Sequence, residues 1–481
     1  MSRRYSIPRH ASPVLTPTSP GPSRPHQRMT FSRFLHSIRN TPPHYPLFIF
    51  LTLLLAASLV SRPDPTSRSF QFPSLLPSSY PPPIRPSDPQ LANILDTTYQ
   101  SFLDHCPRGI RYEPVHLVPT LSIAQERRYA HLRDIASRKG VYMIVATLRQ
   151  IAAQLPDLLN TIVVLVDYLG ADSLAFSILE GPSDDCTPDV LESTLRPLLI
   201  SLGIPSSRVH LSTREGKIDF NNGNRIEILA GLRNRAMEPI WKGGEKVAAV
   251  VAINDVYLKA SDVLELLHWH FNSGAAITTG MDWWKKRPEY YYDVWVGRSM
   301  SGDLFYPIDQ TWWTPSDNLF ETHQPSRDAY SQLRPFQVYA SWNGMAILAP
   351  EPFLPPHNVR FRRGVEEIGE CAASECGLLA QDYWKVGYGR VLVVPSVQLG
   401  YERDVALDII EDLDKQLLDL GWKDGVPPKS LDKPITFDQK PPEKIRCHPW
   451  PEENGLGKNV WGTKVWVGPL DGLEDLRDAW R

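Results

Sequence analysis

Cysteine is scarce in this chain, with five residues among 481. Five are too few for a fold built from disulfides, and none shows the paired C-x-x-C spacing of a zinc site. Cys371 and Cys376 are the expected bridge in an oxidising lumen, with two free thiols as the alternative. The sequence also lacks an Asn-x-Ser/Thr acceptor site, so it offers no evidence from N-glycosylation that the protein lies in the lumen.

An excess of charge of one sign is also missing, because 51 Lys and Arg residues oppose 54 Asp and Glu residues. This balance gives no reason to expect a nucleic-acid partner. The charge is nevertheless uneven, since residues 1–46 contain seven Arg residues and no acid. This basic, Ser/Pro-rich lead has too little apolar surface to fold alone, so we expect a disordered cytoplasmic tail.

The uncharged apolar run Leu47–Val60 is short for a membrane span, which usually needs about 20 residues. It could be an uncleaved signal anchor, a cleaved signal peptide, or a buried helix behind a mitochondrial presequence. The anchor (47–61) is favoured because the basic lead is too long for an ordinary signal peptide, and a presequence would not explain the apolar run. We therefore expect a single-span type II protein of the Golgi or another secretory membrane, with a Pro/Ser-rich stalk over 62–90.

Strand and helix patterns alternate between residues 91 and 403, which predicts an α/β domain with a mixed but largely parallel, Rossmann-type sheet flanked by helices. The expected type II topology places this domain in the lumen. Residues 404–481 read as a helix and an irregular tail. The expected strands are Val141–Leu148, Leu174–Leu179, Arg208–Leu211, the run from Val247, Ala275–Thr279, Phe336–Leu348 and Val391–Val394. The expected helices are Ile123–Lys139, Leu155–Tyr168, Thr187–Leu202, Asn224–Ile240, Ser261–Phe271 and a helix from Arg403 to about Leu420.

The most informative stretch is Val247–Tyr257, in which seven small or β-branched apolar residues stop at Asn254-Asp255. Such a run predicts a strand buried on both faces. An acid just beyond its carboxyl end is well placed to hold a metal or a nucleotide, because ligands of open α/β sheets collect there. An ordinary Asx turn that leads into the next helix is the alternative.

Two other predicted strands end in carboxylates, Glu180 and Asp282. If the strands are parallel, these acids and Asp255 share one edge, where oxygen ligands suit Mg²⁺ or Mn²⁺ bridging a diphosphate. The loop after Glu180 contains Asp185 and leads into a helix, so it could contact phosphate or ribose, or simply cap that helix.

Further candidates lie on predicted helices. Arg225, Arg233 and Arg235 could bind phosphate oxygens or be solvated. Glu375, followed by Asp382, could form a catalytic pair or an acceptor clamp, with a plain helix surface as the alternative. The aromatic residues near Trp283 and Trp312 could stack on sugars or cover the core.

Five segments taken together resemble the fungal capsule-associated mannosyltransferases of glycosyltransferase family 69 in content, order and spacing. They are RIEILAGLRNRAMEP (225–239), INDVYL (253–258), GMDWW (280–284), VYASWNGMAILAP (338–350) and CAASECGLLAQDYW (371–384). The resemblance covers about residues 141–401. It implies a GT-A fold, a nucleotide-sugar donor such as GDP-mannose, divalent manganese, and retention of anomeric configuration.

The resemblance also implies roles for single residues. Asn254-Asp255 takes the place of the family's DxD-type motif, so that Asp255 would bind metal and Asn254 would shape the donor site. Glu180, Asp185 and the Arg233-Asn234 pair would lie by the nucleotide. The acceptor side would contain Asp282, Trp342 and Asn343, with Glu375 and Asp382 as the catalytic candidates.

The predicted function is therefore retaining α-1,3 transfer of mannose from GDP-mannose to a mannose-containing glycan of the cell wall or capsule. Two alternatives stay open at this point. One is a transferase that uses another nucleotide sugar, such as a UDP-sugar. The other is a membrane-tethered scaffold that keeps the fold without activity.

Overall fold

The computed structural model describes residues 89–106, 113–116, 120–216, 223–284, 291–306, 318–365, 370–447 and 465–469. The predicted tail (1–46), the predicted anchor (47–61) and all but the last two residues of the stalk lie outside these ranges. Within them, no helix combines the length and apolar character that crossing a membrane requires.

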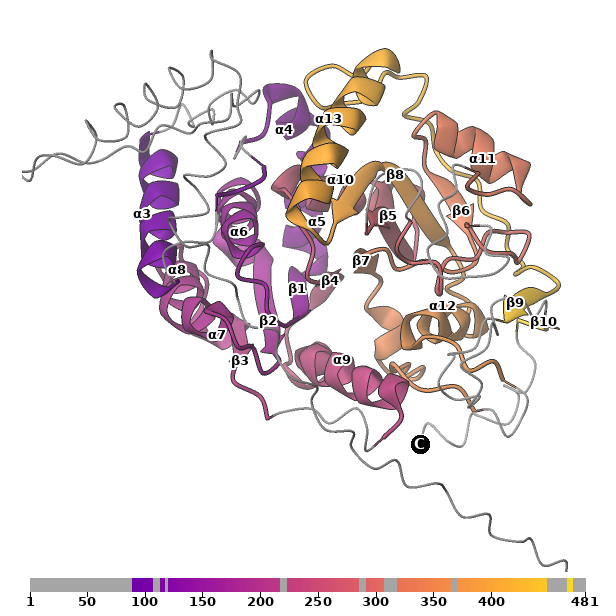
Figure 1. Ribbon diagram of the computed structural model, residues 1–481, viewed down its shortest axis with the longest axis horizontal. Helices are drawn as coiled ribbons and strands as arrows, with labels where there is room; N and C mark the ends of the chain where they lie inside the picture. Colours follow the sequence, from indigo (N-terminus) through magenta and orange to yellow (C-terminus); the bar gives the residue numbers. More distant parts are fainter. Residues whose placement is uncertain are drawn as a thin grey trace, which may run out of the picture. The chain divides into compact units, whose positions relative to one another are not determined.

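One mixed sheet of eight strands, in the order β3-β2-β1-β4-β7-β5-β8-β6, forms the centre of the structure (Figure 1). The pairings make β6 and β7 antiparallel to their neighbours and the other strands mutually parallel. The strands are β1 Val141–Leu148, β2 Leu174–Glu180, β3 Val209–Ser212, β4 Val247–Ile253, β5 Ile277–Trp283, β6 Phe336–Val338, β7 Met345–Leu348 and β8 Val391–Gly400. The prediction of a mixed α/β sheet is confirmed.

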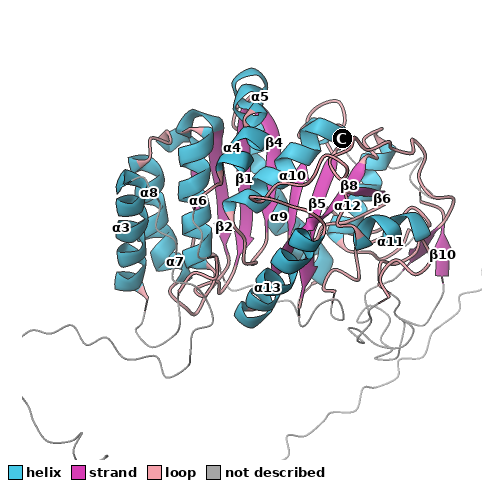
Figure 2. Ribbon diagram, turned by 90° about the horizontal axis from the view of Figure 1, so that it is seen from above, coloured by secondary structure: helices cyan, strands magenta, loops and turns pink. Residues whose placement is uncertain are grey.

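Both faces of this sheet are buried, as the continuous apolar strands predict. In β1, Tyr142 and Ile144 belong to the core on one face, while Met143 and Val145 belong to the core on the other. Helices α6 (Leu155–Leu169) and α10 (Ala260–Ser273) supply the first core, and α9 (Arg225–Lys242) and α12 (Glu375–Lys385) the second. The strands and the helices beside them can be followed in Figure 2.

The remaining helices are α3 Pro89–His105, α4 Ile123–Tyr129, α5 His131–Lys139, α7 Thr187–Val190, α8 Arg196–Ser201, α11 Gln324–Ser331 and α13 Arg403–Asp419. Several predicted boundaries change. The expected helix 123–139 is two helices that meet at Ala130, and the expected helix 187–202 contains a π-helical segment, Leu191–Leu195, between α7 and α8. Asn224 caps α9, and Pro239 lies inside that helix, which continues to Lys242.

The predicted single strand Phe336–Leu348 is wrong, because the chain turns in its middle. Asn343 and Gly344 have φ angles of 57° and 75°, in the left-handed region that an extended strand does not use. The turn sends β6 to the edge beyond β8 and places β7 between β4 and β5.

The expected Cys371–Cys376 bridge is also wrong, as is its alternative of two free thiols. Cys371 is bonded to Cys447 and Cys106 to Cys186, while Cys376 is a buried free thiol. Cys376 lies in the first turn of α12, whereas Cys371 lies in the irregular segment before it and is bonded to the last residue of strand β9 (Ile445–Cys447). Strand β9 pairs with β10 (Val465–Val467) in a small antiparallel sheet.

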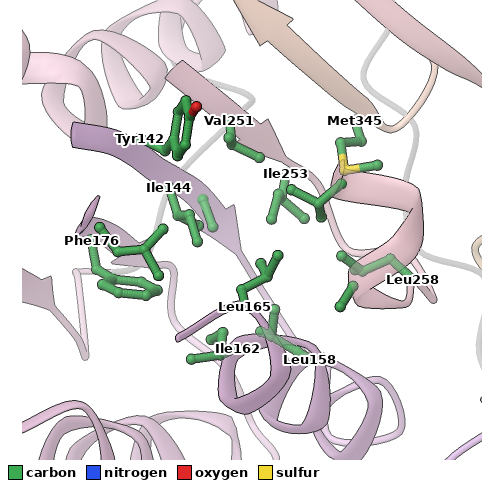
Figure 3. Packing of buried hydrophobic residues seen from close by; sticks show 14 of the residues in the cluster. Tyr142, Ile144, Leu158, Ile162, Leu165, Phe176, Val251, Ile253, Leu258 and Met345 are labelled. Atoms are coloured by element: carbon green, nitrogen blue, oxygen red, sulfur yellow. The ribbon is translucent and has the colours of Figure 1, made fainter. Parts of the chain in front are cut away.

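The core between α6 and the sheet is closely packed, and Figure 3 shows Ile162 among Leu158, Leu165 and Phe176. Ile162 is fully buried, so Ile162→Ala leaves a cavity and is expected to lower the free energy of unfolding by about 2–5 kcal/mol. Urea denaturation measures this as a lower midpoint with an unchanged slope. Ile200→Ala on α8 is the control, because Ile200 is 43% exposed; an equal loss there would contradict the assignment of this core.

Candidate active site

A cavity of about 520 Å³ opens where the parallel strands end. Its lining residues come from the ends of β1, β2, β4, β5 and β8, from the loops after β2 and β3, from the segment 292–296, from the turn before β7, and from α9 and α12. They include Thr147, Arg149, Gly181, Pro182, Glu215, Arg225, Arg233, Asn254, Asp255, Asp282, Tyr292, Asp293, Trp295, Val296, Trp342, Ser374, Glu375, Cys376 and Tyr401. The sheet topology thus gathers side chains that are far apart in the sequence.

Arg233 connects three elements of this cavity. Its Nε donates to Glu375 Oε1 at 2.9 Å and its Nη1 donates to Asn254 Oδ1 at 3.3 Å. Its guanidinium carbon lies 4.8 Å from the ring centre of Trp342, whose Nε1 also donates to Asn254 Oδ1, at 3.3 Å. A planar, permanently charged group suits these contacts, because it can donate in its plane and stack on a ring at once.

Glu375 is held at the start of α12. Ser374 caps this helix by accepting from the Cys376 backbone N–H at 3.3 Å, and Glu375 follows in the first turn, where the helix dipole favours a negative charge. The Glu375 side chain is 4% exposed. Burial raises the pKa of the adjacent Cys376 thiol well above its usual range, so this thiol stays protonated.

Asp255 follows β4 and its side chain is accessible from the cavity. The protein atoms around it raise the pKa of this carboxyl, and the nearby Arg233 lowers it in part. An accessible carboxyl with incomplete solvation gains most from an external cation, so the arrangement fits the predicted role of Asp255.

Asp282 and Asp293 form a buried pair in the wall of the cavity that Asp255 also lines. Asp282 Oδ1 accepts from the Asp293 backbone N–H at 3.2 Å, and Asp282 Oδ2 accepts from the Tyr401 hydroxyl at 3.1 Å. Asp293 Oδ2 accepts from the Asn343 backbone N–H at 2.9 Å. Burial and then the Asp293 charge raise the pKa of Asp282 well above its usual range, and burial raises the pKa of Asp293 to about 6.

This pair predicts a pH dependence of stability. The unfolded chain releases the Asp293 proton near pH 3.8 and the folded protein near pH 6, so the folded state holds more protons in between. The free energy of unfolding therefore falls as pH rises through this window, by at most about 1.4 kcal/mol per pH unit for one group. Asp293→Asn keeps an oxygen for the Asn343 N–H and should flatten the curve measured by urea unfolding from pH 4 to 7. An unchanged curve would contradict the raised pKa.

The structure brings six of the eleven predicted site residues to the cavity wall: Arg233, Asn254, Asp255, Asp282, Trp342 and Glu375. The other five do not line it. Glu180 is fully buried and its carboxylate accepts from the backbone N–H groups of Ser183 at 3.1 Å and Arg214 at 2.7 Å. Asp185 accepts from the Ala152 N–H at 3.1 Å, so both acids hold loops at the rim.

Asn234, Asn343 and Asp382 also support the surrounding structure. The Asn234 amide pairs with both backbone groups of Phe361, at 2.8 and 3.0 Å. Asn343 occupies the turn before β7, where its Nδ2 donates to the Gly280 carbonyl at 2.6 Å. Asp382 is fully buried and accepts from Arg362 at 2.7 and 2.9 Å. The ligand-binding and catalytic roles predicted for them stay predictions.

Sequence reasoning missed several lining residues. Asp293, Tyr292 and Trp295 stand in the segment 291–296, in which the aromatic residues were the signal that could have found this part of the lining. Tyr401 follows β8, and strand β8 is longer than its apolar pattern indicated. Arg149 follows β1, and this position after a parallel strand could have identified it.

No group of three or more His, Cys, Asp or Glu side chains positioned to hold a metal occurs in the described ranges. Directly after β4 the chain offers one carboxylate, Asp255, so a cation held there would complete its shell with other oxygens. Mg²⁺ and Mn²⁺ sites of nucleotide enzymes commonly use one or two carboxylates with substrate phosphates and water, so the donor set fits such an ion.

Residues 141–382 match the family model described as Cryptococcal mannosyltransferase 1. The chain belongs to this mannosyltransferase family, which confirms the resemblance inferred from the five segments. It is 52% identical, over 471 residues, to the alpha-1,3-mannosyltransferase CMT1 of Cryptococcus neoformans var. neoformans serotype D. The alignment covers 96% of this chain and 98% of that relative. A solved structure of S. aureus TarS residues 1–349 aligns with 59% of this chain and 67% of its own at 10% identity and a TM-score of 0.31, too low to carry an argument.

Proposed function

We propose that this protein transfers mannose from GDP-mannose to a mannoside acceptor in α-1,3 linkage, with retention of configuration. The observation that carries the proposal is the cavity in which Asp255, Arg233 and Glu375 meet, each from a different motif. Support comes from the 52% identical relative, whose name gives an alpha-1,3-mannosyltransferase. The mixed sheet with β7 reversed between β4 and β5 suits the GT-A fold that we propose for the domain.

The nucleotide diphosphate belongs beside β1 and β2 in this proposal. Thr147, Arg149, Gly181 and Pro182 line that side of the cavity, outside the carboxyl ends of the two strands. Dinucleotide and nucleotide ligands of α/β sheets bind in this position. Arg225 and Arg149 add cationic groups that suit phosphate oxygens.

The acceptor belongs beside the segment 292–296 and the turn before β7, where Trp295, Val296 and Trp342 contribute apolar lining. Aromatic faces suit the C–H faces of sugars, and the adjacent carboxyls of Asp282 and Asp293 can accept from sugar hydroxyls. This wall therefore offers both an apolar platform and polar contacts to a glycan.

Asp255 would hold Mn²⁺, or Mg²⁺, in the proposed enzyme. When bound, such an ion supplies neutralisation of the charge on the leaving diphosphate. The chain's own residues orient the reactants: Arg233 keeps the Glu375 carboxylate in place, and Glu375 can stabilise positive charge that develops on the transferred sugar. Asn254, which accepts from Arg233 and Trp342, fixes the turn that presents Asp255.

We also propose that the protein is a single-pass type II protein of the Golgi or a related membrane, with this domain in the lumen. The two disulfides support this placement, because disulfides form and persist in oxidising compartments. The apolar run Leu47–Val60 supports a membrane anchor on sequence grounds alone.

The test uses the detergent-solubilised full-length protein with Mn²⁺, an α-mannoside acceptor, and a panel of GDP- and UDP-sugars. Transfer from GDP-mannose, with NMR of the product showing an α-1,3 linkage, is the expected result. Transfer from a UDP-sugar alone would replace the donor, and neither transfer nor donor binding by calorimetry would favour the scaffold.

A further inference from the structure

Strand β9 lies beyond residues 141–382, which match the family model. It nevertheless contacts the chain near two separate parts of the cavity lining. We call residues 295–296 the Trp295 wall and residues 374–376 the Glu375 wall; both line the cavity. Their contacts with β9 are independent of each other, one through hydrogen bonds and the other through a covalent bond.

Arg298 connects β9 to the Trp295 wall. Its side chain is buried; its Nε donates to the Arg446 carbonyl at 2.9 Å, and its Nη1 donates to the carbonyls of Trp295 at 3.1 Å and Gly297 at 2.8 Å. One rigid guanidinium thus fixes the backbone of the wall relative to the backbone of β9.

Arg446 of β9 adds two contacts to the segment that follows this wall. Its backbone N–H donates to the Gly302 carbonyl at 2.9 Å, and its Nη1 lies 3.2 Å from Asp303 Oδ1. The Arg446 side chain is 8% exposed, so solvent screens this ion pair weakly. These contacts make β9 part of the support of the Trp295 wall.

The disulfide Cys371–Cys447 connects β9 to the Glu375 wall. Cys371 precedes Ser374, the N-cap of α12, by three positions, with a backbone bond from Ala373 N–H to the Cys371 carbonyl at 2.7 Å between them. The disulfide therefore limits where α12 can begin. It also limits the position of Glu375, which lies in the first turn of that helix.

We propose that β9 is a positioning element that holds the two walls at the spacing the acceptor sugar requires, through Arg298 and the Cys371–Cys447 disulfide. This inference rests on the proposed function. It gives the C-terminal segment a role in acceptor binding, while the nucleotide side, beside β1 and β2, does not depend on it.

The test compares two disulfide variants of the full-length protein. Cys371→Ser/Cys447→Ser opens the bond at β9, and Cys106→Ser/Cys186→Ser opens a bond of similar span, 80 residues against 76, as the matched control. Similar spans constrain the unfolded chain to a similar degree, so both variants should show comparable shifts in melting temperature.

The expected result is a KM for the acceptor raised about 10-fold in the β9 variant, equivalent to about 1.4 kcal/mol of lost acceptor binding, because the two walls are no longer held at a fixed spacing. Its KM for GDP-mannose and its affinity for GDP should stay within about twofold of the wild type, because misplacing the acceptor wall leaves uniform donor binding intact. The control variant should keep the wild-type KM for the acceptor. Equal acceptor effects in the two variants, or none in the β9 variant, would overturn the inference.

Reduction of the folded wild type gives a second measurement if the variant does not fold. Dithiothreitol, with the open disulfide identified by mass spectrometry, should raise the acceptor KM of the wild type and of the Cys106→Ser/Cys186→Ser control. Removal of the reductant should restore it. If the acceptor KM does not change in either protein although the 371–447 disulfide is open, the inference is overturned. If the wild type transfers no mannose at all, the proposed function itself is overturned.

Discussion

Asp255→Ala should reduce mannose transfer by at least about 100-fold, the loss typical when a group that stabilises developing charge is removed. Asp255 is accessible from the cavity, so the substitution removes a ligand for the cation without opening the core. Its raised pKa means that the folded protein disfavours the charged form, so removal should leave the melting temperature unchanged or higher.

The measurement is the transfer rate at several Mn²⁺ concentrations, together with calorimetric titration of GDP in the presence of the ion. For the wild type we expect Mn²⁺ to enhance GDP binding, and Asp255→Ala should bind GDP without this enhancement. Asp184→Asn is the matched control, because Asp184 is an exposed carboxylate in the loop after β2 that does not line the cavity. Transfer that survives Asp255→Ala unchanged would remove this metal site from the proposal.

Arg233→Met is expected to abolish detectable transfer and to destabilise the fold. The substitution leaves the 4% exposed Glu375 carboxylate without its cation, and an unpaired buried charge of this kind costs about 3–5 kcal/mol. It also removes the hydrogen bond from Arg233 to Asn254 and the cation stacked on the Trp342 ring.

The double variant Arg233→Met/Glu375→Gln separates stability from activity. Neutralising Glu375 should restore most of the lost free energy of unfolding, measured by urea denaturation, because position 375 then no longer carries an unpaired buried charge. Mannose transfer should stay absent, because the double variant lacks the Glu375 carboxylate and the Arg233 guanidinium that orients it. Recovery of transfer in the double variant would show that the Arg233–Glu375 pair acts on folding alone.

The sequence was sufficient to predict β4 and the position of Asp255. Both depend on local information, since an uninterrupted apolar run is buried on both faces and ends where a polar pair begins. Glu180 has the same signature at the end of β2, yet it is buried in the protein interior. Its carboxylate accepts a hydrogen bond from the backbone N–H of Arg214, which follows β3. A contact between residues this far apart in the sequence cannot be predicted from a local pattern.

Long-range contacts also explain the other differences. Asp293 follows no strand, and it reaches the cavity because the Tyr292 N–H donates to the Asp282 carbonyl at 3.0 Å and the Asp293 N–H to the Asp282 carboxylate. The Cys371–Cys447 bond depends on the C-terminal segment packing beside the chain that precedes α12, and the tail's composition gives no sign of it. The turn at Asn343-Gly344, by contrast, lies within the segment 338–350 that carried the family resemblance, and its interruption of the predicted strand was missed.

The reversed strand β7 governs when this protein can fold as well as how it is built. Strands β4 and β5 do not pair with each other; each pairs with β7, which leaves the ribosome after α10, β5, α11 and β6. Until β7 inserts, both strands present open edges, and the Asn254 N–H has no Gly344 carbonyl to bind. Such non-local pairing slows folding and leaves intermediates exposed to aggregation. The cavity is therefore completed late in synthesis, and truncation before residue 345 would leave a sheet in two halves.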